Sequence, residues 1–102
     1  MSTIHQFRAI ALSFEDTSEV QHFDRRAFRT KRKIFATLIE AEATGIALLT
    51  PAEQYVFCKT DDKNIYPVPN KWGLKGATCI HLAKVKTAFL QEILLTAYRH
   101  AT

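Results

Sequence analysis

The stretch AFRTKRKIFATLIEAEATGIALLT, residues 27–50, decides the fold of this 102-residue chain. Within it, β-branched and aromatic residues gather in three short runs that polar residues separate, a pattern typical of strands joined by turns. The expected strands are residues 27–30, 34–40 and 46–50. In the second turn, EATG, Gly45 would supply the positive φ that other residues avoid. Because the turns are short, we expect the strands to pair antiparallel.

An amphipathic helix should precede these strands. Thr3 and Gln6 have the spacing of a capping box, in which each side chain bonds a backbone N–H at the start of a helix. Apolar residues then recur at three- and four-residue intervals and form one stripe, which consists of Ile4, Phe7, Ala11 and Phe14. The polar stretch EDTSE, residues 15–19, ends the helix. The stripe predicts that this helix packs on one face of the sheet.

A second capping box follows the three strands. Thr50, Pro51 and Glu53 combine a cap, a proline at the first helical position and the reciprocal carboxylate, so a short helix should run to about Lys59. Its expected inward face consists of Ala52, Tyr55, Val56 and Phe57. The next apolar segment, IYPVP at residues 65–69, carries two prolines that cannot donate to a ladder. This segment is therefore predicted to lie at a sheet edge.

The last third of the chain predicts a hairpin and a helix. A glycine-containing turn at residues 71–76 leads to a strand at residues 77–82. Alternation along this strand puts three side chains on one face, those of Thr78, Ile80 and Leu82. A broad apolar stripe then indicates a helix over residues 84–100.

Together these elements give an α+β fold class, with an antiparallel sheet packed against N- and C-terminal helices in a two-layer sandwich, as one domain over residues 1–102. Phe35 and Trp72 should be mostly buried. The apolar runs are far too short for a membrane span, and the amino terminus lacks the pattern of a secretory signal. We therefore expect a cytoplasmic protein that does not enter the membrane, with Cys58 and Cys79 as thiols.

Four stretches, ALSF, HFDRRAFRTKRKIFATL, YPVPNKWGLKGATCIHL and TAYRHA, occur in an order that resembles the MmcQ/YjbR family of small bacterial proteins. The resemblance covers nearly the whole chain. It implies a fold similar to that of the frataxin-like CyaY proteins, and DNA binding through paired hairpins that form a double wing. The stretch FEDTSEV departs from the Leu-Pro-Gly turn that is common after the first helix in this family, which leaves the geometry of that turn open.

Basic residues gather at the two predicted hairpins and suit contacts with DNA. Between Arg25 and Lys33 six of nine residues are Lys or Arg and none is acidic, and no Asp or Glu occurs between Lys63 and Gln91. Cations at both tips would neutralise phosphates and release counterions without reading the base sequence, while an aromatic ring could stack on a base. The candidate nucleic-acid-binding residues are Arg25, Arg26, Arg29, Lys31, Arg32, Lys33, Lys71, Trp72 and Lys75.

An alternative function needs no nucleic acid. Lysines at hairpin tips and on edge strands also prevent aggregation between sheets, so the formal net charge of +4 does not by itself require an anionic partner. The chain would then be a protein-interaction or small-ligand module that uses the groove between sheet and helices.

Metal binding and catalysis find little support in the residue pattern. His22 and Asp24 would share one strand face, and Cys79 and His81 lie on another strand. These side chains are ones that zinc prefers, but nothing brings the two pairs together. The first helix carries no carboxylate that would bind iron. Cysteines and histidines are present, yet no nucleophile elbow, phosphate loop or HExxH spacing occurs. We therefore expect no metal, no cofactor and no enzyme activity.

Overall fold

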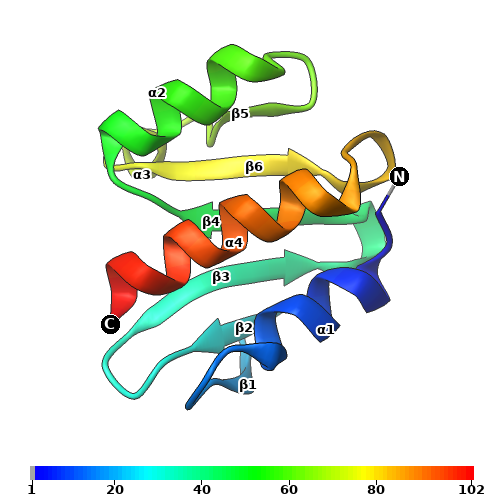
Figure 1. Cartoon of the computed structure of the whole chain (residues 1–102), viewed down its shortest axis with the longest axis vertical. Coiled ribbons are helices and arrows are strands. Elements are labelled where there is room, and N and C mark those ends of the chain that lie inside the picture. Colours follow the sequence, from blue (N-terminus) through cyan, green and yellow to red (C-terminus); the bar gives the residue numbers. More distant parts are fainter. Residues whose placement is uncertain (1) are drawn as a thin grey trace.

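The computed structural model describes residues 2–102, which form one six-stranded sheet with helices packed on it. The elements in chain order are α1 (Ile4–Ser13), β1 (Ser18–His22), β2 (Arg25–Arg29), β3 (Ile34–Ile39), η1 (Glu40–Glu42), β4 (Thr44–Leu48), α2 (Pro51–Thr60), β5 (Ile65–Pro67), α3 (Lys71–Leu74), β6 (Ala77–His81), η2 (Leu82–Lys84) and α4 (Thr87–Ala101). The strand order is β1-β2-β3-β4-β6-β5, and all neighbours pair antiparallel. Figure 1 shows α1, α2 and α4 on the same face of the sheet. The predicted α+β sandwich is confirmed, and no helix within residues 2–102 is long and apolar enough to cross a bilayer.

The main core lies between the sheet and the helices α1 and α4. Phe7 of α1 packs edge to face on Phe28 of β2, with the ring centroids 5.6 Å apart. Phe35 is fully buried as predicted, and its ring lies against those of Phe14 and Tyr98. A bulge between β2 and β3 lets Phe35 and the next residue both be buried, although neighbours on a regular strand face opposite ways. The α4 side chains that close this core are Leu90, Ile93, Leu94 and Ala97.

Both predicted capping boxes are present, at the first turns of α1 and α2. The predicted inward face of α2 was largely wrong, because Tyr55 and Val56 are exposed and Gln54 is buried. The Nε2 group of Gln54 donates to the carbonyls of Gly73, at 2.9 Å, and Ala77, at 3.0 Å. Since α2 lies over the β5–β6 edge and not over the centre of the sheet (Figure 1), a polar anchor serves it better than a broad apolar face.

The segment after α1 contains a strand that the sequence analysis did not predict. β1 is polar and mostly exposed, so no apolar alternation marks it, and it pairs only with β2. His22 pairs with Arg25, which makes Phe23 and Asp24 the two residues of a tight turn. The expectation that His22 and Asp24 share a strand face was therefore wrong.

Gly45 is needed for close packing and not for a turn. It lies inside β4, and the left-handed residue of this turn is Ala43, at a φ of 49°. A Cβ atom at Gly45 would lie 2.3 Å from Cε2 of Phe7. The missing side chain thus allows α1 to approach β4, and the predicted positive φ at Gly45 was wrong.

The glycine-containing stretch before β6 forms one helical turn, α3, whose N-cap is Asn70. Gly76 follows it at a φ of +113°, a conformation that favours glycine. Trp72 is 38% exposed, so the prediction that it is mostly buried was wrong. The helical turn carries the indole outside the main core, to the opposite side of the sheet, where it lies beside Leu48.

Candidate functional site

The face of the sheet that points away from α1 and α4, here called the open face, carries the candidate site. Strand pairing sets one row of side chains across it, in the order Ala27, Thr37, Ile46, Cys79 and Tyr66. The apolar cluster on this face is separate from the main core, and none of its members comes from α1 or α4. Neither α1 nor α4 covers this face, and the short helical turn α3, which carries Trp72, borders it.

A hollow of about 400 Å³, here called the face hollow, lies between the tip of the β1–β2 hairpin and α3. This volume is within the range of pockets that hold small ligands. Its lining residues are His22, Phe23, Asp24, Arg25, Ile34, Thr37, Leu48 and Trp72. The face hollow therefore combines an apolar floor with a polar rim on the hairpin side.

Thr37 gives the face hollow an unpaired polar group. The residue is 2% exposed, and its Oγ1 is the one buried side-chain N or O atom within residues 2–102 that has no hydrogen-bond partner. The buried hydroxyls of Thr30 and Thr78, in contrast, donate to backbone carbonyls. A hydroxyl can donate and accept, and leaving one unpaired costs about 1–3 kcal/mol. The Thr37 hydroxyl is thus an unpaired polar group buried in the wall of the face hollow.

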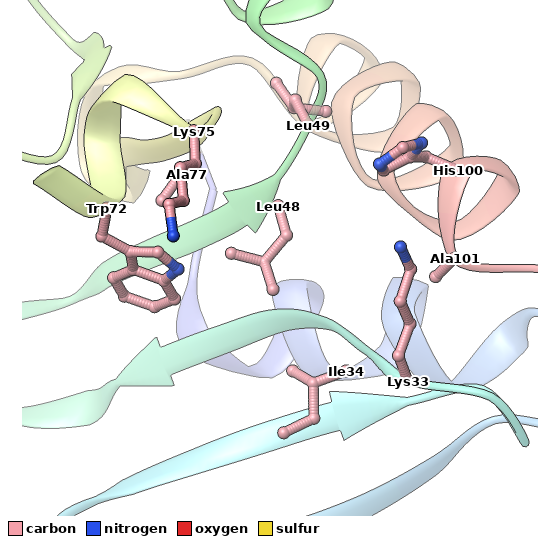
Figure 2. Close-up of a pocket in the computed structure, with 9 residues that line it drawn as sticks. All are labelled: Lys33, Ile34, Leu48, Leu49, Trp72, Lys75, Ala77, His100 and Ala101. Atoms are coloured by element: carbon pink, nitrogen blue, oxygen red, sulfur yellow. The ribbon is translucent and has the colours of Figure 1, made fainter.

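A second hollow of about 130 Å³, here called the end hollow, lies where β3 begins and α4 ends. Figure 2 shows Lys33 extending toward His100 on one side, and Lys75 beside Trp72 on the other. No Asp or Glu lines the end hollow. Two ammonium groups without a carboxylate make it suitable for an anion such as a phosphate.

The two hollows adjoin, because Ile34, Leu48 and Trp72 line both of them. The two hollows together are here called the trough. Its lining contains three Lys or Arg side chains and one carboxylate, that of Asp24. This carboxylate is largely exposed and lies 3.7 Å from the Nε atom of Arg25. The trough therefore offers unpaired positive charge in the end hollow, a charge pair at the hairpin side, and an apolar, aromatic middle.

Four of the nine residues predicted to bind nucleic acid line this trough: Arg25, Lys33, Trp72 and Lys75. The other five do not. Lys31 pairs with Asp16 at 3.8 Å, and Arg32 donates to the carbonyl of Thr102 at 3.1 Å. Arg29 donates to the carbonyl of Thr30, and Lys71 is exposed on α3 outside both hollows.

Arg26 is engaged on the opposite face of the sheet. Its guanidinium bonds Glu19 and Gln21, and Glu19 also accepts from Arg8 of α1 at 2.9 Å. Partial burial raises the pKa of Glu19, but the hydrogen bonds from Arg26 and Arg8 outweigh this and hold it below its ordinary value. This ion-pair cluster links α1 to the β1–β2 hairpin and leaves Arg26 unavailable to the open face.

Phe23 stands out at the hairpin tip. Its side chain is 88% exposed, and its φ is 58°, which is unusual for a bulky residue. A positive φ occurs in tight turns, and here the turn places the ring beside the face hollow. Together with Tyr66, which is 41% exposed, and Trp72, it gives the open side of the protein three accessible aromatic rings.

The cysteines and histidines show no catalytic or metal arrangement among the described residues. Burial raises the pKa of both the Cys58 and the Cys79 thiol, and a protonated thiol is a weak nucleophile and metal ligand. Within residues 2–102, no three His, Cys, Asp or Glu side chains are grouped so that they could hold a metal ion. His22 and Asp24 line the face hollow, whereas His81 does not.

A further hollow, of about 410 Å³, lies on the helix side between the end of α2 and the start of α4. Its lining residues are Thr60, Asp61, Lys84, Val85, Lys86 and Phe89. This is the position in which the predicted groove between sheet and helices would lie. Among residues 2–102, no side chain that lines this hollow has a buried polar atom without a hydrogen-bond partner, as Thr37 has in the face hollow.

Comparison with known proteins supports the fold. The chain is similar to the crystal structure of the Deinococcus radiodurans protein DR2400, which has a DUF419 domain, with a TM-score of 0.77 and 16% sequence identity. The match covers 95% of this chain and 76% of that one. No family model matches the sequence, and no curated protein matches it. At this identity the likeness shows a shared fold, and the function has to be argued from the trough.

Sequence reasoning missed several residues of the trough. No functional role was assigned from the sequence to Phe23, to Thr37 in a predicted strand, or to His100 at the end of a predicted helix. Their shared location arises because the hairpin tip, the middle of β3 and the end of α4 meet on one side of the sheet. Among the aromatic residues of the trough, Trp72 alone was predicted, because it lies within a basic stretch.

Proposed function

We propose that the protein binds DNA weakly and with little sequence preference, through phosphate contacts in the end hollow. The observation that carries this proposal is that Lys33 and Lys75, from the two separate basic regions, line one hollow together with Trp72 and no carboxylate. Paired ammonium groups bind phosphates without reading bases, which gives affinity without sequence specificity. We also propose that the chain belongs to the MmcQ/YjbR family, which it resembles in the order of four sequence stretches.

The positions of the basic residues reduce the number of cations that we expect to contact phosphates. The double-wing interpretation predicts that all the cations at the hairpin tips contact DNA. Lys31 and Arg32, however, have partners outside the trough. Lys33 and Lys75 have no carboxylate among their neighbours in the end hollow. A phosphate that enters there replaces water and not an internal ion pair, so its binding does not break an existing interaction.

Fluorescence anisotropy with labelled DNA tests the proposal. At low salt we expect saturable binding with a dissociation constant of about 1–100 μM, in the range of non-specific complexes, and a marked loss of affinity between about 50 and 200 mM salt. If neither duplex nor single-stranded DNA binds at about 100 μM protein, the proposed function is wrong.

Two double variants with the same change in formal charge locate the contacts. Lys33→Glu with Lys75→Glu should reduce the slope of log affinity against log salt by about 2, because each lysine accounts for about one phosphate contact. Arg32→Glu with Lys71→Glu alters cations outside the trough and should leave the slope nearly unchanged. A larger loss of slope in the second variant would show that the hairpin tips, and not the end hollow, bind the phosphates.

A further inference from the structure

We infer that the trough binds single-stranded DNA in preference to duplex, with one base seated in the face hollow and stacked on Trp72. This inference rests on the proposed function, because it takes DNA as the molecule that the end hollow binds. It adds the kind of strand and the position of a base, which the phosphate contacts alone do not specify.

The shared wall of the two hollows supports this arrangement. Trp72 borders the end hollow, which is cationic, and the face hollow, which is apolar. A nucleotide carries its phosphate and its flat aromatic base on one sugar, so a phosphate near Lys33 and Lys75 brings a base to the indole. Stacking on an aromatic side chain is the main contact through which proteins hold single strands without sequence preference.

The face hollow has the chemistry that a base requires. Ile34 and Leu48 provide apolar contacts along its floor, and the Thr37 hydroxyl is buried there without a partner. Every base has an edge with donors and acceptors, and a hydroxyl can bond either kind. Arg25 at the hairpin side is paired with Asp24, so the phosphate contacts come from the end hollow.

A duplex fits this trough poorly. The unpaired hydroxyl and the face of the indole are useful only to a base whose ring face and edge are both accessible, and paired bases stack on one another inside the helix. The exposed aromatic rings of Phe23 and Tyr66 extend the same kind of surface. Basic residues around exposed aromatics on an open antiparallel sheet are the general features of a platform for single strands.

Binding to two labelled oligonucleotides of equal length tests the inference, namely a 12-residue oligothymidine and a 12-base-pair duplex. The wild-type protein should bind the single strand several-fold more tightly than the duplex at the same salt concentration. Trp72→Ala should weaken binding to the single strand about fivefold or more, because one stacked base contributes about 1–3 kcal/mol. Its effect on the duplex should be small, so the preference for the single strand should disappear.

Matched variants separate the trough from general effects. Tyr55→Ala removes an exposed aromatic ring on the helix side and should leave both affinities unchanged. Thr37→Val keeps the shape of the side chain and removes the free hydroxyl, so it should weaken binding to the single strand about threefold or more. Thr78→Val removes a buried hydroxyl outside the trough and should have no such effect.

The possible results distinguish this inference from the proposed function. Equal or tighter binding to the duplex, or an unchanged preference in Trp72→Ala, would overturn the inference while phosphate-dependent DNA binding stands. Competition by free thymidine monophosphate as effective, per nucleotide, as that by the strand would also overturn it, because the trough would then hold a single nucleotide. Absence of binding to both oligonucleotides would remove the proposed function itself.

Discussion

The two faces of the sheet have the same strands and opposite properties. On the helix-covered face, Phe7, Phe28 and Phe35 are fully buried, and the hydroxyl of Thr78 bonds a backbone carbonyl. On the open face, Trp72 is accessible and the hydroxyl of Thr37 has no partner. In a face that serves stability alone, polar groups are bonded and aromatic rings are buried. The unpaired hydroxyl and the accessible ring therefore make the open face the candidate binding face.

This contrast also explains why the basic stretch does not act as a unit. Alternation along β2 directs Arg26 to the helix-covered face, where Glu19 neutralises it, and Arg25 to the open face. Lys33 reaches the end hollow because β3 begins there. The cations that line the trough are therefore selected by strand geometry, and not by their density along the chain.

The largest expected effect on stability comes from comparing one aromatic residue from each face of the sheet. Phe35→Ala should lower the free energy of unfolding by about 3–5 kcal/mol, because it opens a cavity in the main core. Trp72→Ala should cost less, about 1–3 kcal/mol, since over a third of this residue is already exposed. Chemical denaturation measures both. A loss for Trp72→Ala as large as that for Phe35→Ala would make Trp72 a core residue and would contradict the contrast.

A smaller effect is expected where α1 approaches the sheet. Gly45→Ala should destabilise the protein by about 1–3 kcal/mol, because the new Cβ would overlap the ring of Phe7. Phe7→Leu costs stability by itself, but in the double variant the two losses should be less than additive, because the smaller side chain relieves the overlap. Thermal unfolding of the two single variants and the double variant gives this coupling. Strict additivity would show that Phe7 is not what requires glycine at this position.

The two buried threonines should respond with opposite signs. Thr37→Val should stabilise the protein by about 1 kcal/mol, because it removes an unpaired buried hydroxyl and keeps the side-chain volume. Thr78→Val should destabilise it by about 0.5–1.5 kcal/mol, because it removes a bonded hydroxyl. Urea denaturation at pH 7 is sufficient to measure both. If Thr37→Val is also destabilising, the hydroxyl has a partner in solution and the face hollow loses its free polar group.

The smallest effect concerns the ion-pair cluster on the helix-covered face. The pKa of Glu19 is lower in the folded than in the unfolded protein, so its stabilisation is present above the unfolded value of about 4.3 and is lost as the pH falls through the folded value. Glu19→Gln should therefore lower stability by less than about 1 kcal/mol near pH 7 and by progressively less below about pH 4.

Unfolding curves between pH 3 and 7 measure this convergence. Glu92→Gln, at an exposed position on α4, provides the control and should remain parallel to the wild type. If the difference for Glu19→Gln is constant with pH, the carboxylate does not hold Arg26 and Arg8.

Local signals predicted much of the fold. The capping boxes at Thr3 and Thr50 mark the true starts of α1 and α2, and the three central strands lie within two residues of their predicted bounds. The polar edge strand β1 was missed, because a strand that buries almost nothing carries no apolar alternation. The predicted inward face of α2 failed because a helix at the edge of a sheet is not held by one continuous stripe.

The sequence by itself determined most of the elements of this protein, their fold class and the presence of excess positive charge, because these depend on local periodicity, capping and composition. Only the tertiary structure decided which of the nine candidate residues meet. Arg25, Lys33, Trp72 and Lys75 line one trough because strand pairing and the β3, β4 and α3 termini bring them to the same face. The unpaired hydroxyl of Thr37 also belongs to the tertiary level, because hydrogen-bond satisfaction depends on neighbours from other strands.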